Sequence, residues 1–198
     1  MREYTIRSGS RDDLPRMPAA PIDVPLWGGS FGISAQAQLC YDSDALYVRL
    51  RAAEEHIRAE NTEVWQEPCE DSCLEFFFSP VPGDRRYLNV EFNLKGCMYL
   101  GLGSCMDDLV RLVPDKGDPF AFRAQTTPDG WEITYAVPHD FVRRFFPAYA
   151  PRAGMVIRGN FYKCGDKTAH PHYLAWNPIR TEAPLFHVPD DFGTLRFA

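Results

Sequence analysis

The sequence predicts an all-β fold, an antiparallel β-sandwich of the jelly-roll type with about ten strands and one short helix. Several short segments alternate apolar and polar residues with a period of two, as strands with one buried face do. Turn-forming residues separate these segments at regular intervals, and 17 prolines and 14 glycines are spread along the chain. The length of 198 residues fits a single domain, residues 1–198, with a sizeable core.

The N-terminal segment predicts a short strand near Tyr4–Ile6 and then, up to residue 34, an irregular proline-rich stretch that wraps over the body. Trp27, just before Gly28-Gly29, is expected to anchor this stretch by packing into the core. Residues 35–40 and 46–52 alternate around the turn Asp42-Ser43-Asp44, which predicts a β-hairpin.

Two further strands carry the clearest signals in the chain. Cys73–Phe78 is short and aromatic and ends at Ser79-Pro80, which predicts a buried strand. Tyr87–Leu94 alternates over its whole length, and Lys95-Gly96 then predicts a turn into a strand at 97–102.

The second half of the chain continues the same pattern. A hairpin is predicted across Pro128-Asp129-Gly130, and the one short helix is expected between Pro138 and Pro147. Residues 107–110 fit a helical turn or a bulge. The last predicted segments are a strand at 155–162, a loop or short strand at 170–177, and a closing strand at 193–197.

Charge and composition exclude several classes of partner. The net charge is −6 and no basic cluster is present, which argues against nucleic acid or an anionic membrane surface. No apolar run is long enough to span a bilayer, and Met1–Ile6 has no signal-peptide character. With no export signal, we expect the six cysteines to be reduced and the protein to be cytoplasmic.

Polar residues at the outward positions of the predicted strands suggest a binding surface. If these strands are neighbours, their guanidinium, carboxylate and amide groups would match the vicinal hydroxyls of a sugar. Trp65 and Trp176, both in predicted loops, would supply flat plates for the ring. For any one of these residues, a solvated face with ordinary ion pairs is the better explanation, and only the set taken together favours a binding surface. The polar residues are Arg49, Arg51, Glu75, Asn89, Glu91, Asn93, Arg158 and Asn160.

Glu75 lies within an apolar strand, where a carboxylate is costly to bury unless another group pairs with it. Together with Glu91 it offers a different function, that of a glycosidase acid and base. Such enzymes place two carboxyl groups about 5–10 Å apart around the scissile bond. Gly-x-Ser-x-Gly is absent, and Gly101-Leu102-Gly103 lacks the helix that a phosphate loop needs.

Metal binding has weaker support in the sequence. Cys69 and Cys73 do not have a Cys-x-x-Cys spacing, and no second pair matches them. His170, His172 and His187 lie close in sequence and offer a possible zinc site, although packing in a proline-rich loop explains them as well. A haem- or metal-binding protein that uses His170, His172 or a methionine is therefore a third hypothesis.

Several motifs, in order, resemble family 9 carbohydrate-binding modules, and the resemblance runs from about Gln36 to the end of the chain. They are Tyr41–Val48, Trp65, Asp71–Phe78 (D-S-C-L-E-F-F-F), Gly130-Trp131-Glu132-Ile133 with Val137-Pro138, and Asp191-Phe192-Gly193-Thr194-Leu195.

The resemblance implies a β-sandwich related to the DOMON class that binds sugar ends between two tryptophans. Trp65 and Trp176 stand at the matching positions, with Glu75 as the hydrogen-bonding acid. It also implies a structural calcium ion, whose ligands are not identified. We therefore expect a non-catalytic protein that binds a mono- or oligosaccharide, with the glycosidase and the haem- or metal-binding protein as alternatives.

Overall fold

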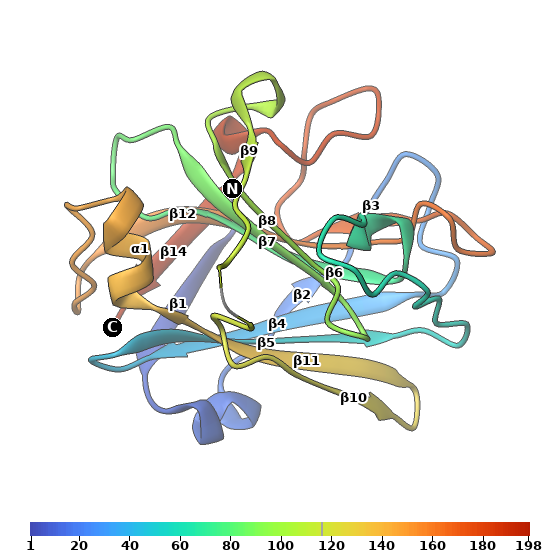
Figure 1. Ribbon diagram of the computed structural model, residues 1–198, viewed down its shortest axis with the longest axis horizontal. Coiled ribbons are helices and arrows are strands. Elements are labelled where there is room, and N and C mark those ends of the chain that lie inside the picture. Colours follow the sequence, from blue (N-terminus) through green and yellow to red (C-terminus); the bar gives the residue numbers. More distant parts are fainter. Residues whose placement is uncertain (116) are drawn as a thin grey trace.

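The computed structural model describes residues 1–115 and 117–198, which form one curled β-sheet (Figure 1). Its strands are β1 (Glu3–Ser8), β2 (Ala20–Ile22), β3 (Val24–Leu26), β4 (Ser34–Tyr41), β5 (Ala45–Ala53), β6 (Cys73–Ser79), β7 (Tyr87–Asn93), β8 (Met98–Gly103), β9 (Val110–Arg111), β10 (Arg123–Thr127), β11 (Gly130–Pro138), β12 (Val156–Cys164), β13 (Tyr173–Ala175) and β14 (Gly193–Phe197). The helices are α1 (His139–Phe145) and the 3-10 turns η1 (Arg11–Arg16), η2 (Pro68–Glu70), η3 (Met106–Asp108) and η4 (Pro189–Asp191).

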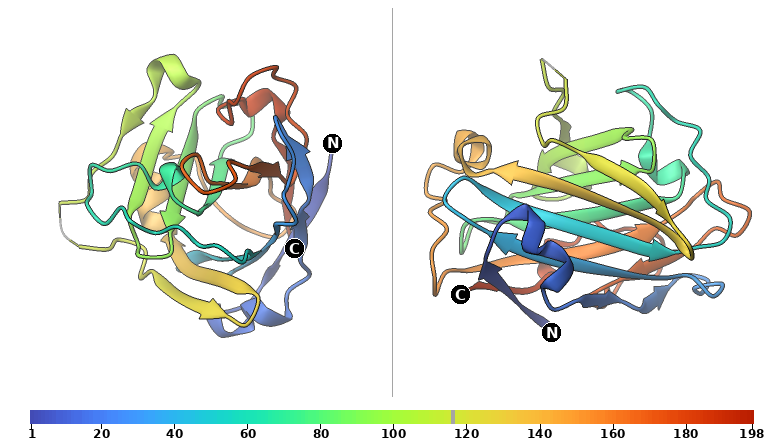
Figure 2. Two further views of the ribbon diagram at one scale, coloured as in Figure 1. Left: turned by 90° about the vertical axis from the view of Figure 1, so that its right-hand side faces the viewer. Right: turned by 90° about the horizontal axis from the view of Figure 1, so that it is seen from below.

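The sheet folds back on itself into two facing halves, as Figures 1 and 2 show. One half has the order β10-β11-β5-β4, and the other has the order β14-β12-β6-β7-β8-β9. Strand β1 joins them, because it pairs with β14 along its first part and with β4 along its last part. The mostly-β sandwich predicted from the sequence is confirmed.

Three details of the predicted fold are wrong. The described residues contain fourteen strands rather than about ten, and the sheet is mixed because β1 runs parallel to both of its neighbours. Strand β1 confirms the strand predicted near Tyr4–Ile6, but the rest of the segment up to residue 34, which was expected to be irregular, contains η1, β2 and β3. Prolines interrupt the alternation in β2 and β3, so the sequence pattern hides two strands that tertiary pairing stabilises.

Local sequence explains the predicted elements that are confirmed. The β4–β5 hairpin turns where the Asp42 carboxylate accepts hydrogen bonds from the backbone N–H groups of Asp44 and Ala45, at 2.8 and 3.1 Å. Helix α1 begins directly after Pro138 and has only seven residues. None of the described helices is long and apolar enough to span a membrane.

The main core fills the space between the two halves of the sheet. Apolar residues from alternate positions of β4, β5 and β11 face those of β6, β7 and β12. Representative members are Leu39, Val48, Leu50, Phe76, Phe78, Val90, Trp131, Ile133, Phe161 and Leu195.

The half that contains β6 and β7 is also covered on its outer face. All residues of these two strands are buried, so their polar sides are not exposed to water as simple alternation suggests. A second apolar cluster lies here, formed by strand residues such as Phe77 and Tyr162 and by Ile179 and Phe192 from the irregular segment 176–192. We call this irregular segment the C-terminal loop. This covered face carries Glu75, Glu91 and Asn89.

Candidate ligand-binding site

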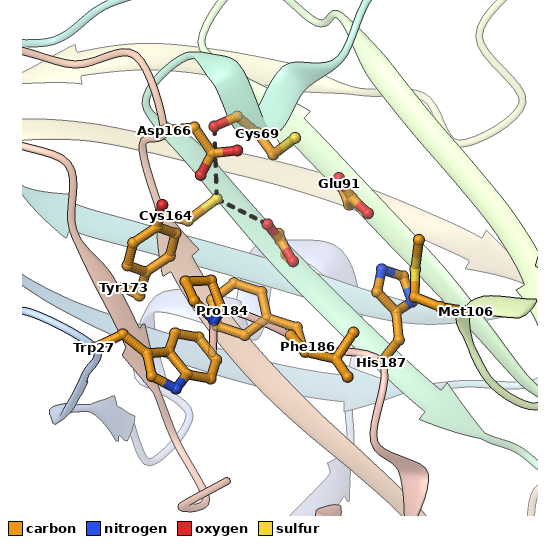
Figure 3. A pocket seen from close by; sticks show the side chains of 12 residues that line it. Trp27, Cys69, Glu91, Met106, Cys164, Asp166, Tyr173, Pro184, Phe186 and His187 are labelled. Carbon is orange, nitrogen blue, oxygen red and sulfur yellow. Dashed lines mark hydrogen bonds between the residues drawn. The ribbon is translucent and has the colours of Figure 1, made fainter. Parts of the chain in front are cut away.

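A cavity of about 200 Å³ lies over the outer face of β6, β7 and β12 (Figure 3). Its floor is polar and contains Glu75, Glu91 and Cys164. Trp27 and Tyr173 lie on one side of it, and Met106 and His187 lie on the opposite side. The cavity is therefore built from the sheet and from segments distant in sequence.

The two floor carboxyl groups are neighbours. Glu75 and Glu91 occupy directly opposed positions of β6 and β7, and their exposed fractions are 2% and 5%. Glu75 accepts a hydrogen bond from the Cys164 thiol at 2.9 Å, and Glu91 accepts one from the Asn89 amide at 2.7 Å. Because a carboxylate can accept about four hydrogen bonds, neither group is saturated by these contacts.

Burial changes the charge of this floor. Desolvation raises the pKa of Glu75 to about 8. Desolvation, followed by the neighbouring Glu75 carboxyl group, raises the pKa of Glu91 well above its usual value. Burial therefore favours the protonated form of both groups, and a protonated carboxyl group can donate a hydrogen bond as well as accept one.

An aromatic wall stands beside the carboxyl pair. Trp27 follows β3 in a tight turn in which it and the next two residues, Gly28 and Gly29, have positive φ angles. Its indole N–H donates to the Thr181 carbonyl at 2.8 Å, and its ring centroid lies 5.5 Å from that of Phe186. These contacts tie the N-terminal segment to the C-terminal loop.

Two further contacts hold the C-terminal loop against the sheet. Phe186 stacks on Tyr162 of β12 with ring centroids 4.2 Å apart. His187 Nδ1 lies 2.8 Å from the Tyr87 hydroxyl. Burial lowers the pKa of His187 to about 4, so this imidazole is neutral at physiological pH.

The predicted polar surface divides into two parts. Arg49 and Arg51 belong to β5 in the other half of the sheet, where they form ion pairs with Glu132 and Asp129. They therefore cannot share a ligand with Glu75, because the main core separates the two outer faces.

Among the predicted residues near the cavity, only Glu75 and Glu91 line it. Asn89 supports Glu91 from an adjacent outward position. Asn160 exchanges hydrogen bonds with the backbone of Asn177, at 2.8 and 2.9 Å, and so secures the start of the C-terminal loop. Arg158 donates to the carbonyls of Phe192 and Gly193 in the same region.

Asn93 also has a structural role. Its amide donates to the Asp71 carboxylate at 2.7 Å and to the Asn61 carbonyl at 2.8 Å. Its side-chain oxygen accepts from the backbone of Cys97 at 2.9 Å, at the β7–β8 turn. For Asn93, Arg158 and Asn160, the protein itself satisfies the groups that were predicted to bind a sugar.

The predicted pair of tryptophan plates is not found. The Trp176 side chain is 2% exposed and packs on Phe161 in the main core. Its indole also fills the space over Gly193, where a β-carbon would collide with the ring. Trp65 is 70% exposed in the loop before η2, but it does not line this cavity. The two rings therefore cannot clamp one ligand.

The histidine zinc site considered from the sequence is not formed, because no group of three metal-ligating side chains among the described residues includes a histidine. His172 is buried, with Nε2 2.7 Å from the Lys163 ammonium, and this lysine pairs with Glu54. His170 stacks on Phe31 at a centroid distance of 5.3 Å, while His187 belongs to the cavity. The hypothesis of a haem-binding protein that uses His170, His172 or a methionine stays a prediction.

The resemblance to family 9 implies a structural calcium ion, which would need several oxygen ligands close together. Across residues 1–115 and 117–198, one group of three or more Asp, Glu, His or Cys donors converges closely enough to hold an ion. It consists of Cys73, Glu75 and Cys164, whose sulfur atoms do not suit Ca²⁺. Among the described residues, no three carboxylates converge on one point, so a calcium site there would depend on backbone and amide oxygens.

Sequence reasoning missed most of the cavity wall. Trp27 was expected to pack as a core anchor, and Tyr173, Phe186 and His187 were not linked to Glu75. One signal was available: the C-terminal loop is a long irregular segment, and such loops often carry binding residues.

Comparisons with known proteins support a common family. The chain matches carbohydrate-binding family 9 over residues 13–197. A structure from Bacteroides uniformis described as a "putative carbohydrate-binding protein" is 26% identical, has a TM-score of 0.85, and covers 100% of this chain and 99% of its own. Among proteins with curated functions, none matches.

Two structures of a family 9 module from Caldicellulosiruptor kristjanssonii share the fold. The complex with glucose is 15% identical, with a TM-score of 0.70 and coverage of 100% of this chain and 96% of its own. The complex with cellotriose is 14% identical, with a TM-score of 0.69 and coverage of 99% and 93%. Because the family match extends over nearly the whole sequence, the chain belongs to carbohydrate-binding family 9.

Proposed function

We propose that this protein is a non-catalytic saccharide-binding module and that one sugar ring enters the cavity above Glu75 and Glu91. The family and the structures with bound glucose and cellotriose support a saccharide ligand. The observation that carries the proposal is the buried, incompletely hydrogen-bonded carboxyl pair beside an aromatic wall.

The chemistry of the cavity suits a sugar. Two protonated carboxyl groups offer donors and acceptors for adjacent hydroxyls, which also act as both. Trp27 and Phe186 offer apolar surface for the C–H face of the ring. The cavity volume of about 200 Å³ is below the roughly 300–1,000 Å³ of sites for drug-sized ligands, so a single terminal ring fits better than a long oligomer.

The same carboxyl pair favours binding over hydrolysis. Glycosidases keep one carboxyl group protonated and the other ionised, because the two groups have different roles. Here burial raises the pKa of both Glu75 and Glu91, so neither supplies a ready base or nucleophile at neutral pH. The glycosidase is therefore the second candidate function.

Calorimetric titration with glucose, cellotriose and a panel of other saccharides tests the proposal. We expect binding to weaken about tenfold or more in Glu91→Leu and in Trp27→Ala, since each removes one ligand contact of about 1.4 kcal/mol or more. Trp65→Ala is the matched control, and its affinity for a monosaccharide should equal that of the parent protein.

The opposite pattern would overturn the site. Binding that is lost in Trp65→Ala and kept in Trp27→Ala and Glu91→Leu would place the ligand elsewhere. Binding to none of the saccharides would overturn the function itself. Turnover of an aryl glycoside that disappears in Glu75→Gln would establish the glycosidase alternative instead.

A further inference from the structure

Two of the six cysteines face each other beneath the cavity. Cys73 of β6 and Cys164 of β12 occupy directly paired positions of the antiparallel ladder, and both are buried. Glu75 lies two residues after Cys73 on the same face of β6. All six cysteines of the chain are unpaired, so these two sulfur atoms are free to bind another group.

The three side chains converge on one point. The Sγ atoms of Cys73 and Cys164 and a carboxylate oxygen of Glu75 all lie within 4.8 Å of one another. Zinc–sulfur and zinc–oxygen bonds of about 2.3 and 2.0–2.2 Å separate the donors of a tetrahedral site by roughly 3.5–4 Å. An ion therefore fits among these atoms after small side-chain movements. Within the described parts of the chain, no other such group of donors exists.

The cavity gives this group access to solvent. Cys164 and Glu75 line the cavity floor, whereas Cys73 is not among the lining residues and lies beneath it. An ion held by the three would have two thiolates and one carboxylate as protein ligands. A fourth position would face the cavity, and an open fourth position is typical of zinc sites that bind an external ligand.

From this geometry we propose that Cys73, Cys164 and Glu75 form a binding site for one thiophilic divalent cation of the Zn²⁺ class. Thiolate donors select Zn²⁺ and similar ions over Ca²⁺ and Mg²⁺, which prefer oxygen. Two thiolates and one carboxylate also balance the charge of a divalent ion to within one unit. The site does not require a bound saccharide, although it shares Glu75 with the proposed sugar site.

A disulfide between Cys73 and Cys164 is the competing explanation for two facing cysteines. It would use only the two sulfur atoms, and it gives no role to a carboxylate oxygen placed 2.9 Å from Cys164 Sγ. The metal site accounts for all three side chains.

The test uses the full chain, reduced, stripped of metal with a chelator and titrated with Co²⁺ and then Zn²⁺. We expect one equivalent of Co²⁺ to produce the near-ultraviolet sulfur-to-cobalt absorption band and Zn²⁺ to abolish it by displacement. Zn²⁺ should raise the melting temperature, and Mg²⁺ and Ca²⁺ should not.

Variants assign the ligands. Cys73→Ser and Cys164→Ser should each weaken Zn²⁺ binding about a hundredfold or more and reduce the cobalt–sulfur band. The control Cys105→Ser, which changes an exposed cysteine outside the group, should bind like the parent. Circular dichroism checks that each variant is folded. If a cysteine variant does not fold, the cobalt absorption spectrum of the parent protein alone tests the proposed site.

Three results would overturn the site. They are the absence of a cobalt–sulfur band in the parent protein, unchanged binding in both folded cysteine variants, and a thiol count of four with Cys73 and Cys164 joined in protein isolated without reductant. Saccharide binding measured without metal would be unaffected by any of these results, so failure here is distinct from failure of the proposed function.

Discussion

Asp71 and Glu75 are buried acids only four residues apart, yet their surroundings differ sharply. Asp71 accepts hydrogen bonds from the Arg58 guanidinium, the backbone N–H groups of Glu60 and Asn61, and the Asn93 amide. Glu75 has one such contact, from the Cys164 thiol, and Glu91 has one from an amide. Groups of the protein therefore satisfy the hydrogen-bonding capacity of Asp71, whereas Glu75 and Glu91 can each accept further hydrogen bonds.

The difference separates structural acids from candidate binding acids. Asp71 ties the β5–β6 connection to β7 through Arg58 and Asn93, so it stabilises the start of β6 and the end of β7. Glu75 and Glu91 face a cavity, where a sugar hydroxyl or a cation can complete their coordination. Burial alone therefore does not mark a functional acid, and the number of protein donors around it is the better guide.

The largest effect is expected at Asp71. Asp71→Ala should lower the free energy of unfolding by about 3 kcal/mol, because it leaves the Arg58 charge and the Asn93 amide without their partner. Urea denaturation measures this loss. The control Glu60→Ala removes an exposed partner of the same arginine and should change stability by less than about 1 kcal/mol. Equal losses in both variants would contradict the structural role of Asp71.

A smaller effect concerns the charge state of the cavity wall. His187 has a folded-state pKa of about 4, against about 6.5 in the unfolded chain. The unfolded state therefore binds the extra proton first, and stability should fall as the pH is lowered from about 6.5 to 4. The loss from this group is on the order of 3 kcal/mol.

His187→Asn isolates this contribution. Urea denaturation of both proteins across the same pH range should give curves that converge as the pH falls, since only the parent carries this histidine. Parallel curves would show that His187 has the same pKa in the folded and unfolded states. Burial in the cavity would then not disfavour the charged imidazole.

The smallest change in stability is expected at the cavity floor. Glu91→Gln replaces a protonated acid with a neutral group of the same shape, so the free energy of unfolding at pH 7 should change by less than about 1 kcal/mol. This is the reverse of Asp71, where stability depends on the carboxylate. A loss as large as that of Asp71→Ala would place Glu91 among the structural acids.

Much of the fold follows from local sequence. The β4–β5 hairpin, the buried strand β6, the alternating strand β7 and helix α1 were all predicted, because period-two alternation and turn residues act over a few positions. The parallel pairing of β1 was not predicted. It joins the first and last strands of the chain, and no local pattern encodes such a contact.

The site was less predictable than the fold. Glu75 and Glu91 could be chosen because acids in apolar strands are unusual, and the register of β6 and β7 brings them together. The burial of Trp176 could not be predicted, because a tryptophan at the start of the irregular C-terminal loop has no alternating pattern around it that would mark a buried side chain. Trp27 and Phe186 meet through the C-terminal loop, whose path depends on contacts across the whole chain.

A crystal structure of the protein grown with glucose or cellotriose tests the central claim most directly. We predict electron density for one sugar ring in the cavity, with its hydroxyls within hydrogen-bond distance of Glu75 and Glu91. Trp27 or Phe186 should pack against the ring. A ring bound on Trp65, with the cavity above the two carboxyl groups filled only by water, would contradict it.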